Sequence, residues 1–301
     1  MQLGMVGLGR MGANMAERLM RGGHKVVGFD PNVDARKSLE SKGATSADSL
    51  QTLVKALSAP RVIWLMVPAG KITDDTVDTL LPLLAAGDAV IDGGNSNYKD
   101  TLRRADAYRA KNVGYVDCGT SGGVWGLQEG YSMMIGGDEK TVDALRPIFE
   151  TLAPAKDQGW GRVGPVGSGH YTKMIHNGIE YGMMQAYAEG FSILKHKKDF
   201  ALDLHQIGDI WRYGSVVRSW LLDLTTDALA KNPQMDGIAP YVADSGEGRW
   251  TVDAALELDV PAPVITLSLL ERLRSRDTDS FSDKLLSAMR NEFGGHPIKK
   301  E

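Results

Sequence analysis

The stretch KMIHNGIEYG, residues 173–182, brings five side chains of different chemistry to helical spacing. Positions i, i+3, i+4, i+7 and i+8 lie on one face of an α-helix. That face would hold an amine, an imidazole, an amide, a carboxylate and a phenol, from Lys173, His176, Asn177, Glu180 and Tyr181. The back of the helix would be apolar and suited to burial, with Met174, Ile175, Ile179, Met183 and Met184. The spacing therefore predicts a helix with a proton acceptor and a proton donor on one face.

Two proton transfers are the chemistry that this face suggests. Oxidation of an alcohol by hydride transfer needs a base for the hydroxyl proton, and Lys173 suits this role if desolvation favours its neutral form. Glu180 suits a general acid if burial favours its protonated form. The alternative is that both charges are solvated and that His176 is structural. We favour chemistry because the helix follows GWGRVGPVGSGH (159–170), a glycine-rich link next to which a cleft is expected.

The start of the chain predicts a dinucleotide-binding turn. Gly7, Gly9 and Gly12 form G-x-G-x-x-G between a strand pattern and a helix pattern. In this motif the first glycine permits the tight turn, the second the approach of a pyrophosphate, and the third helix–strand packing. A second strand, HKVVGFD, ends in Asp30, close to the position expected for the acid that binds ribose hydroxyls. An ordinary glycine turn and a capping aspartate before Pro31 are the alternatives, and the combination favours a bound dinucleotide.

Alternating strand and helix patterns predict a parallel, doubly wound sheet behind this turn. Further strands are expected at 61–67, 88–94, 113–119 and 131–137, and helices at 33–41, 47–57, 71–85, 98–111 and 139–152. Ligands bind at the carboxyl ends of strands in such sheets. Two strands end there in unusual loops, DGGNSNY (92–98) and CGTSGGVWGLQEG (118–130). These loops are either glycine turns or, as we favour, donors to an oxygen-rich substrate from Asn95, Ser121, Gly122 and Gly123.

We place two domains in the chain. The first is a dinucleotide-binding, Rossmann-like domain at 1–164, and the second is an all-α substrate-binding and oligomerisation domain at 165–301. The 301 residues are enough for both. A long helix is expected from about Gly169 to about Lys198, followed by helices and loops.

Composition excludes several classes of function. The net charge of −4 gives no basic field for nucleic acid or a membrane surface, and no apolar run reaches the length of about 18 residues that spans a membrane. The single cysteine, Cys118, excludes an internal disulfide, and neither it nor His176 has a partner at metal-ligand spacing, so no metal site is expected. MQLGMVGLG lacks a basic segment, which favours a first strand over a signal peptide and predicts a cytoplasmic protein.

Taken together, these motifs resemble the 6-phosphogluconate dehydrogenases (decarboxylating) over nearly the whole chain. The blocks GLGRMGANMA, IDGGNSNY, TSGGVWGLQEGYSMMIGG, GHYTKMIHNGIEYGMMQAYAEG and GEGRWT occur in the order of that family's signatures. D-G-G-N-S together with K-M-x-H-N-G-I-E-Y is highly specific. The related β-hydroxyacid dehydrogenases share the fold, the S-G-G loop and a lysine at the position of Lys173, and they typically lack H-N-G-I-E-Y.

The resemblance implies oxidative decarboxylation of 6-phosphogluconate to ribulose 5-phosphate, a step of gluconate use and the pentose phosphate pathway. Lys173 would take the C3 hydroxyl proton during hydride transfer, and Glu180 would protonate the enediol that remains after carbon dioxide leaves. The sugar acid would be held by Asn95, Ser121, Gly122, Gly123, His176 and Asn177. Its phosphate would be held by Tyr181, Arg249, Arg272 and Arg290, with His296 of the tail RNEFGGH also in the substrate site.

Two departures from the family pattern concern the cofactor and the subunits. Asp30-Pro31-Asn32 stands where common members have Asn-Arg-Thr, whose arginine meets the 2′-phosphate of NADP, so NAD is the expected cofactor. We assign it Gly7, Leu8, Gly9, Arg10, Met11, Gly12, Asp30, Val67, Pro68 and Asn95. The chain also lacks the large helical segment that usually precedes the tail. A homodimer or tetramer whose tails complete partner sites is expected.

Two other functions stay open on the sequence. A non-decarboxylating β-hydroxyacid dehydrogenase would use the same fold, although Glu180 and the arginine set argue against it. A non-catalytic nucleotide-binding protein would keep the first domain, although the presence of both Lys173 and Glu180 argues against it.

Overall fold

The computed structural model describes residues 1–300, and its chain contacts separate two compact units. These are Met1–Asn177, called the N-terminal unit here, and Gly178–Glu301, called the C-terminal unit. Helix α8 (Ser168–His196) begins in the first unit and ends in the second. The domain boundary predicted at 164/165 lies just before this helix and stays a prediction.

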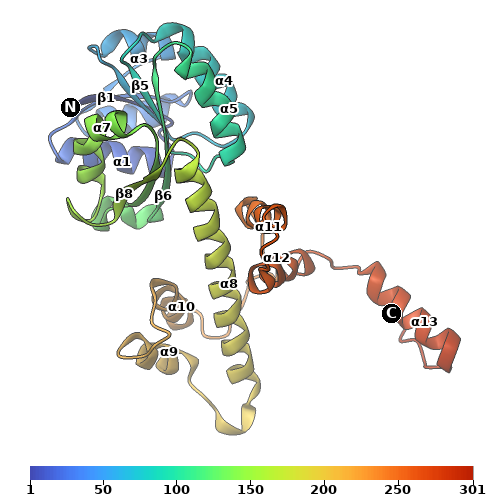
Figure 1. Ribbon diagram of the computed structural model, residues 1–301. Coiled ribbons are helices and arrows are strands. Elements are labelled where there is room, and N and C mark those ends of the chain that lie inside the picture. Colours follow the sequence, from blue (N-terminus) through green and yellow to red (C-terminus); the bar gives the residue numbers. More distant parts are fainter. Residues whose placement is uncertain (301) are drawn as a thin grey trace. The chain divides into compact units, whose positions relative to one another are not determined.

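The N-terminal unit is built on one eight-stranded sheet with helices on both faces (Figure 1). Its strands are β1 (Gln2–Val6), β2 (Lys25–Phe29), β3 (Thr45–Ser46), β4 (Val62–Leu65), β5 (Ala89–Asp92), β6 (Gly114–Ser121), β7 (Ser132–Gly136) and β8 (Trp160–Gly164). They lie in the order β3-β2-β1-β4-β5-β6-β7-β8. The chain runs outward from β1 first on one side and then on the other. The reversal between β1 and β4 is the place where such sheets bind dinucleotides.

Seven α-helices of this unit connect and cover the strands. They are α1 (Arg10–Arg21), α2 (Val33–Glu40), α3 (Leu50–Ala56), α4 (Lys71–Leu80), α5 (Tyr98–Arg109), α6 (Gly126–Glu129) and α7 (Glu139–Leu152), with 3₁₀ turns η1 (Leu81–Leu83) and η2 (Gly123–Trp125) among them. Four helices start after a side chain that accepts a backbone hydrogen bond from the first turn: Asn32, Ser49, Asn97 and Asp138. Such caps satisfy donors that the helix itself cannot, and so fix where it begins.

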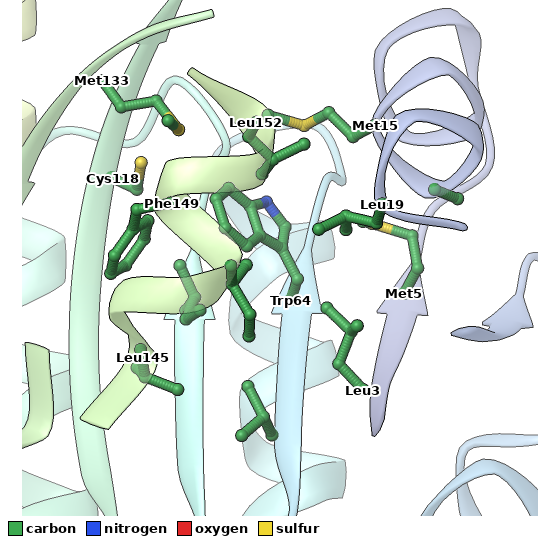
Figure 2. Close-up of a cluster of buried hydrophobic side chains, with 14 of the residues drawn as sticks. Leu3, Met5, Met15, Leu19, Trp64, Cys118, Met133, Leu145, Phe149 and Leu152 are labelled. Atoms are coloured by element: carbon green, nitrogen blue, oxygen red, sulfur yellow. The ribbon is translucent and has the colours of Figure 1, made fainter. Parts of the chain in front are cut away.

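Successive side chains of the central strands point to opposite faces of the sheet, and each face buries one apolar cluster. On one face Trp64 of β4 lies edge-on to Phe149 of α7, with 6.0 Å between ring centroids, and Figure 2 shows both among the packed side chains of β1 and α1. On the other face Ile63 and Leu65 of the same strand pack with residues of α3, α4 and α5. Burial of this kind stabilises a protein by roughly 25 cal/mol per Å² of apolar surface, so both faces contribute.

The predicted doubly wound fold is confirmed, with differences at the edges of the sheet. β7 runs antiparallel to β6, so the prediction of a wholly parallel sheet is wrong there. β8 pairs with β7 inside the stretch 159–170 that was expected to be a link, and β3 pairs with β2 at the opposite edge. The pattern of β8 is hidden by its glycines, yet the strand is fixed because Trp160 stacks on Phe149 at 5.7 Å. Short edge strands leave little periodicity to detect.

The C-terminal unit is all-α, as predicted. After α8 it contains η3 (Lys198–Phe200), α9 (Leu204–Arg212), α10 (Trp220–Lys231), α11 (Glu247–Glu257), α12 (Pro263–Arg274) and α13 (Phe281–Gly294). Its buried apolar cluster is small and centres on Phe191, Leu222 and Leu229.

The predicted burial of the apolar back of α8 is correct only at its first turns. Met174 is buried, whereas Ile179, Met183 and Met184 are 52%, 38% and 42% exposed. The prediction is wrong for these three residues in the single chain. The C-terminal unit has too few apolar side chains of its own to cover them.

Candidate active site

The glycine turn after β1 has the geometry that a bound pyrophosphate requires. Gly7 has a φ of +90°, which strains other residues, and a Cβ on Gly12 would lie 1.9 Å from the carbonyl oxygen of Gly7. A Cβ on Gly9 would meet nothing within 4 Å, so the outer side of the turn is open. Within the described residues, α1 starts after Gly9 without a side-chain cap or an acid in its first turn. Its N–H groups and positive dipole end therefore suit a phosphate.

Asp30 lies one residue beyond β2 and contacts the glycine turn. Its Oδ2 accepts a hydrogen bond from the backbone N–H of Leu8 at 2.7 Å, and its Oδ1 accepts one from Asn32 at 2.8 Å. Each carboxylate oxygen retains a lone pair, which suits a ribose hydroxyl. Arg36 donates to the carbonyl oxygen of Asp30 at 2.6 Å, so a guanidinium group lies beside the acid. Of the other predicted residues at this turn, the side chain of Leu8 is buried, Arg10 is exposed and Met11 is half-buried.

The loops after β4 and β5 meet at the same edge of the sheet. Val67 and Pro68 follow β4, where Val67 is half-buried and Pro68 exposed. Asn95 follows β5 and is exposed. A Cβ on Gly94 would lie 2.9 Å from the carbonyl oxygen of Val67, which shows how closely the two loops pack. The structure thus places these predicted cofactor residues beside one another.

A buried polar network holds the loop that presents Asn95. The Oδ2 of Asp92 accepts hydrogen bonds from the hydroxyls of Ser96 at 2.9 Å and Tyr115 at 3.2 Å, and from Arg104 at 3.4 Å. Both side chains of the Arg104–Asp92 ion pair are 1% exposed. Removing one partner of such a pair leaves an uncompensated buried charge, so the loop is held firmly below its exposed asparagine.

The S-G-G loop starts where β6 ends. Ser121 is the last residue of the strand, and Gly122 and Gly123 have φ values of +133° and +51°. Arg18 of α1 donates to four carbonyl oxygens around the following segment, those of Leu127, Gln128, Thr151 and Ala153. The helix that begins at the glycine turn therefore also fixes the segment that follows the S-G-G loop.

The start of α8 is anchored on the sheet by Asp117, which is fully buried in β6. Its Oδ1 accepts the N–H of Gly167 at 2.7 Å, and its Oδ2 accepts the N–H of His170 at 2.8 Å. A carboxylate at this end of a helix satisfies orphan donors and complements the helix dipole. A Cβ on Gly119 would lie 2.3 Å from the Cβ of Lys173, so α8 runs directly against β6. Backbone packing thereby fixes where Lys173 lies.

His170 links α8 to α5. Its Nδ1 lies 2.7 Å from the Oγ1 of Thr101, and the imidazole is 2% exposed. Its Nε2 has no hydrogen-bond partner among residues 1–300. Because α5 begins just after the loop of Asn95, this contact joins the helix of Lys173 to the support of that loop.

Lys173, His176 and Asn177 are brought together on α8. Lys173 is 7% exposed, and its Nζ donates to the Oδ1 of Asn177 at 2.7 Å. The Nδ1 of His176 lies 3.4 Å from the same Nζ. The amine is thus withdrawn from bulk water and oriented by an amide and an imidazole. A group so placed suits proton transfer with a bound hydroxyl.

In the C-terminal unit, Tyr181 and Arg272 form one contact of the predicted phosphate site. The guanidinium carbon of Arg272 lies 3.4 Å from the centre of the Tyr181 ring. The Tyr181 hydroxyl is buried without a hydrogen-bond partner among the described residues, and a Cβ on Gly248 would lie 2.4 Å from this ring. Glu180, the preceding residue, is half-buried. An aromatic ring with a stacked guanidinium is an arrangement that suits a phosphate group.

Arg249, Arg290 and His296 have different surroundings. Arg249 forms a bidentate pair with Asp244, at 2.9 Å from Nε to Oδ1 and 3.1 Å from Nη2 to Oδ2. Arg290 is exposed on α13, and the described contacts of His296 are local: Asn291 donates to its carbonyl oxygen, and the ring of Phe293 packs on its imidazole. Their assignment to the substrate site stays a prediction.

Sequence reasoning missed the residues that support this site. They are Arg18, Asp92, Arg104, Asp117, His170 and Asp244. One signal was available, because Asp117 interrupts the apolar strand pattern VGYVDCG and a charged residue in a buried strand is seldom unpaired. The side-chain contacts of Arg18 and Asp244 leave no such trace in the sequence.

Two features are absent from residues 1–300. No helix there is both long and apolar enough to cross a membrane. No group of three or more His, Cys, Asp or Glu side chains in that range is arranged to hold a metal ion.

Family profiles match both units of the chain. A profile of the NAD binding domain of 6-phosphogluconate dehydrogenase matches residues 2–161, and a profile of the 6-phosphogluconate dehydrogenase C-terminal domain matches residues 169–283. A Haloferax volcanii protein named 6-phosphogluconate dehydrogenase, NAD(+)-dependent, decarboxylating is 45% identical over all of this chain and 99% of its own length. A Bacillus subtilis protein whose name also refers to 6-phosphogluconate dehydrogenase is 42% identical over the whole of both chains.

Other relatives are longer or share only the fold. The chain covers 61% of an NAD(+)-dependent 6-phosphogluconate dehydrogenase of Bacillus subtilis, at 36% identity. The solved 6-phosphogluconate dehydrogenase of Plasmodium falciparum superimposes with a TM-score of 0.84 at 28% identity, over all of this chain and 66% of that one. The 3-hydroxyisobutyrate dehydrogenase of Mycobacterium tuberculosis has a TM-score of 0.72 at 23% identity, covering 89% of this chain and 90% of that one, and shares the fold.

These matches extend over both units and agree with the glycine turn, the S-G-G loop and the Lys173 stripe. The chain belongs to the 6-phosphogluconate dehydrogenase family.

Proposed function

We propose that this chain catalyses the oxidative decarboxylation of 6-phosphogluconate to ribulose 5-phosphate and carbon dioxide, with NAD as the oxidant. The observation that carries the proposal is the buried Lys173, bonded to Asn177 and anchored through α8, in a chain 45% identical to a relative named for this reaction. Some relatives are longer than this chain. The proposal therefore rests on the segments that this chain shares with them.

The N-terminal unit fits NAD. The open side of the glycine turn and the uncapped start of α1 suit the pyrophosphate, and the carboxylate of Asp30 suits the ribose hydroxyls. When bound, NAD accepts the hydride from C3 of the substrate. A 2′-phosphate would face Asp30, and like-charge repulsion favours NAD over NADP by on the order of a few kcal/mol.

Two groups of α8 move protons in the proposed reaction. Lys173 takes the proton of the C3 hydroxyl as hydride leaves C3, which gives a 3-keto acid. The C1 carboxylate then leaves as carbon dioxide, because the adjacent ketone accepts the electron pair and forms an enediol. Glu180 protonates that enediol to give ribulose 5-phosphate, and general acid–base groups of this kind contribute about 10²–10⁴-fold.

The remaining predicted residues bind and orient the substrate. Asn95, Ser121, Gly122, Gly123, His176 and Asn177 hold the sugar acid, while Tyr181, Arg249 and Arg272 hold its phosphate. The support for the second group is the stacked Tyr181–Arg272 pair, since guanidinium groups bind phosphate in a fixed geometry.

We further propose a cytoplasmic homodimer, or a tetramer built from dimers, in which Arg290 and His296 complete the site of a partner. The exposed apolar residues of the C-terminal unit support this, because large exposed apolar surface marks an interface.

The test is an absorbance assay for NADH with 6-phosphogluconate and each cofactor in turn. Turnover with a higher kcat/KM for NAD than for NADP is expected, and Asp30→Ser should narrow that ratio. A higher kcat/KM with NADP would show that Asp30 has been misassigned, and no turnover with either cofactor would refute the proposed activity.

A further inference from the structure

Three arginines of the C-terminal unit converge on two consecutive residues. Arg272 donates from Nη1 to the carbonyl oxygen of Ala243 at 3.0 Å. Arg249 donates from Nε and Nη2 to both oxygens of the Asp244 carboxylate. Arg276 donates from Nη2 to the Oδ2 of Asp244 at 2.6 Å. These residues, Ala243, Asp244, Arg249, Arg272 and Arg276, are called the arginine cluster here.

The arginine cluster has an excess of positive charge. It contains three guanidinium groups and one carboxylate, whose side chain is only 5% exposed. The hydrogen bond from Arg249, with that from Arg276, lowers the pKa of Asp244 to about 2, so its negative charge is present throughout the neutral range. Within these five residues the positive charges exceed the negative charge by two. A phosphate monoester, which carries about −1.5 to −2 charge at neutral pH, complements them.

Both partners of Asp244 keep donors for a ligand. A guanidinium group has five N–H donors, and Arg249 uses Nε and Nη2 on Asp244, which leaves Nη1. The side chains of Arg249 and Arg276 are 46% and 25% exposed, so solutes can reach them. The bidentate pair fixes the plane of the Arg249 guanidinium before a ligand arrives, and pre-organisation of this kind improves affinity.

We propose that Asp244 is a positioning residue that holds Arg249 and Arg276 as a pair toward the substrate phosphate, and that Arg276 is a phosphate-binding residue of this chain. The inference rests on the proposed function, in which the substrate is a phosphate monoester. In this proposal the arginine cluster, whose Arg272 also stacks on Tyr181, selects phosphorylated over non-phosphorylated sugar acids.

Asp244 could either position the arginines for phosphate or compete with phosphate for them. The two roles predict opposite changes in phosphate affinity when the carboxylate is neutralised. If the carboxylate merely competed with phosphate for the arginines, its neutralisation would strengthen phosphate binding, because a repulsive charge is lost. If it positions them, its neutralisation weakens binding although the net charge becomes more favourable. Asp244→Asn separates the two, since the amide keeps the shape and loses the charge-assisted pair.

The experiment compares Asp244→Asn and Arg276→Leu with a matched control, Arg274→Leu. Arg274 also lies on α12 and also pairs with a carboxylate, that of Asp283, at 2.6 Å. KM and kcat for 6-phosphogluconate are measured with saturating NAD, and binding of inorganic phosphate to each protein is measured by calorimetry. Asp244→Asn and Arg276→Leu should each raise KM and the phosphate dissociation constant about tenfold, with kcat nearly unchanged and Arg274→Leu near wild type.

Three results would overturn the proposal: tighter phosphate binding in Asp244→Asn, an Arg276→Leu protein that matches the Arg274→Leu control, or a loss that falls on kcat and leaves KM unchanged. The calorimetric arm separates this inference from the proposed function. A wild-type protein that binds phosphate through Arg276 and does not oxidise 6-phosphogluconate would retain the arginine cluster as a phosphate site and refute the activity alone.

Discussion

The two units of the chain bury their apolar side chains to very different extents. The N-terminal unit has an apolar cluster on each face of its sheet, with Trp64 and Phe149 fully buried. The C-terminal unit has one small cluster, while Ile193 and Val216 are 71% and 99% exposed. A unit that leaves so much apolar surface in water is not a complete folding unit. This contrast supports the proposal that a partner subunit covers the exposed apolar residues of the C-terminal unit.

The same contrast holds for the groups that are proposed to bind ligands. Lys173 is fixed by backbone contacts to a buried carboxylate and a glycine strand, which leave little freedom. Arg249 is fixed by a side-chain ion pair with the buried Asp244, while its own side chain is 46% exposed. Groups that perform chemistry need firm placement, whereas groups that capture an incoming phosphate also need access.

The largest expected effect is on the chemical step. Lys173→Met should lower kcat by at least about 10²–10⁴-fold, because the base is lost while the fold is kept. Lys195→Met is the matched control, on the same helix and exposed, and should retain the wild-type rate. Stopped-flow measurement of NADH formation checks both. A near-wild-type rate in Lys173→Met would exclude this lysine as the base.

Truncation of one phenylalanine in each unit should have unequal effects on stability. Phe149→Ala, at a fully buried site, should reduce the free energy of unfolding by about 3–5 kcal/mol. Phe200→Ala, at a site 67% exposed, should change it by less than about 0.5 kcal/mol. Chemical denaturation followed by circular dichroism measures both. Equal losses would mean that Phe200 is covered in the assembled protein.

Removing the C-terminal tail tests whether subunits share substrate sites. Truncation after Leu286 removes Arg290 and His296, and the loss of the two proposed substrate contacts should raise KM for 6-phosphogluconate about 100-fold. The dissociation constant for NAD should stay within about twofold, because the glycine turn is untouched. Sedimentation should show a dimer or larger assembly for the full chain. A fully active monomer would rule out shared sites.

The smallest effect concerns acid stability. Since the folded pKa of Asp244 is about 2 against an ordinary 3.8, its stabilisation is complete above the ordinary value and is lost as the pH falls through about 2. Solvent screens a pair whose arginine is 46% exposed, so the effect should be at most about 1 kcal/mol. Between about pH 5 and pH 2, wild type should therefore lose up to about that much more unfolding free energy than Asp244→Asn. Parallel curves for the two proteins would show that the pair contributes nothing to folding.

The thiol of Cys118 offers a reporter for the N-terminal unit alone. Burial raises its pKa to about 12, so it should not react with thiol reagents in the folded protein. The rate at which Cys118 reacts with a thiol reagent during denaturation therefore measures the unfolding of the N-terminal unit separately.

The fold and the first contacts of the site were predictable because their signals are local. The glycine turn, the Asp30 strand end and the Lys173 stripe each depend on spacing within about one helix or turn, which the sequence displays directly. Asp117 and Arg18 contact partners at least 50 residues away in the chain, and no local sequence pattern indicates such partners. The exposed Ile179 was predicted to be buried because helical periodicity identifies an apolar face and does not say what covers it.

The central claim is the coupling of oxidation to decarboxylation in one site. The direct measurement is the ratio of carbon dioxide released to NADH formed when the purified protein acts on 6-phosphogluconate with NAD. A ratio of about one is expected, with ribulose 5-phosphate as the remaining product, because the 3-keto acid loses its carboxylate in the site. NADH formation without carbon dioxide would contradict it and would indicate a β-hydroxyacid dehydrogenase on the same fold.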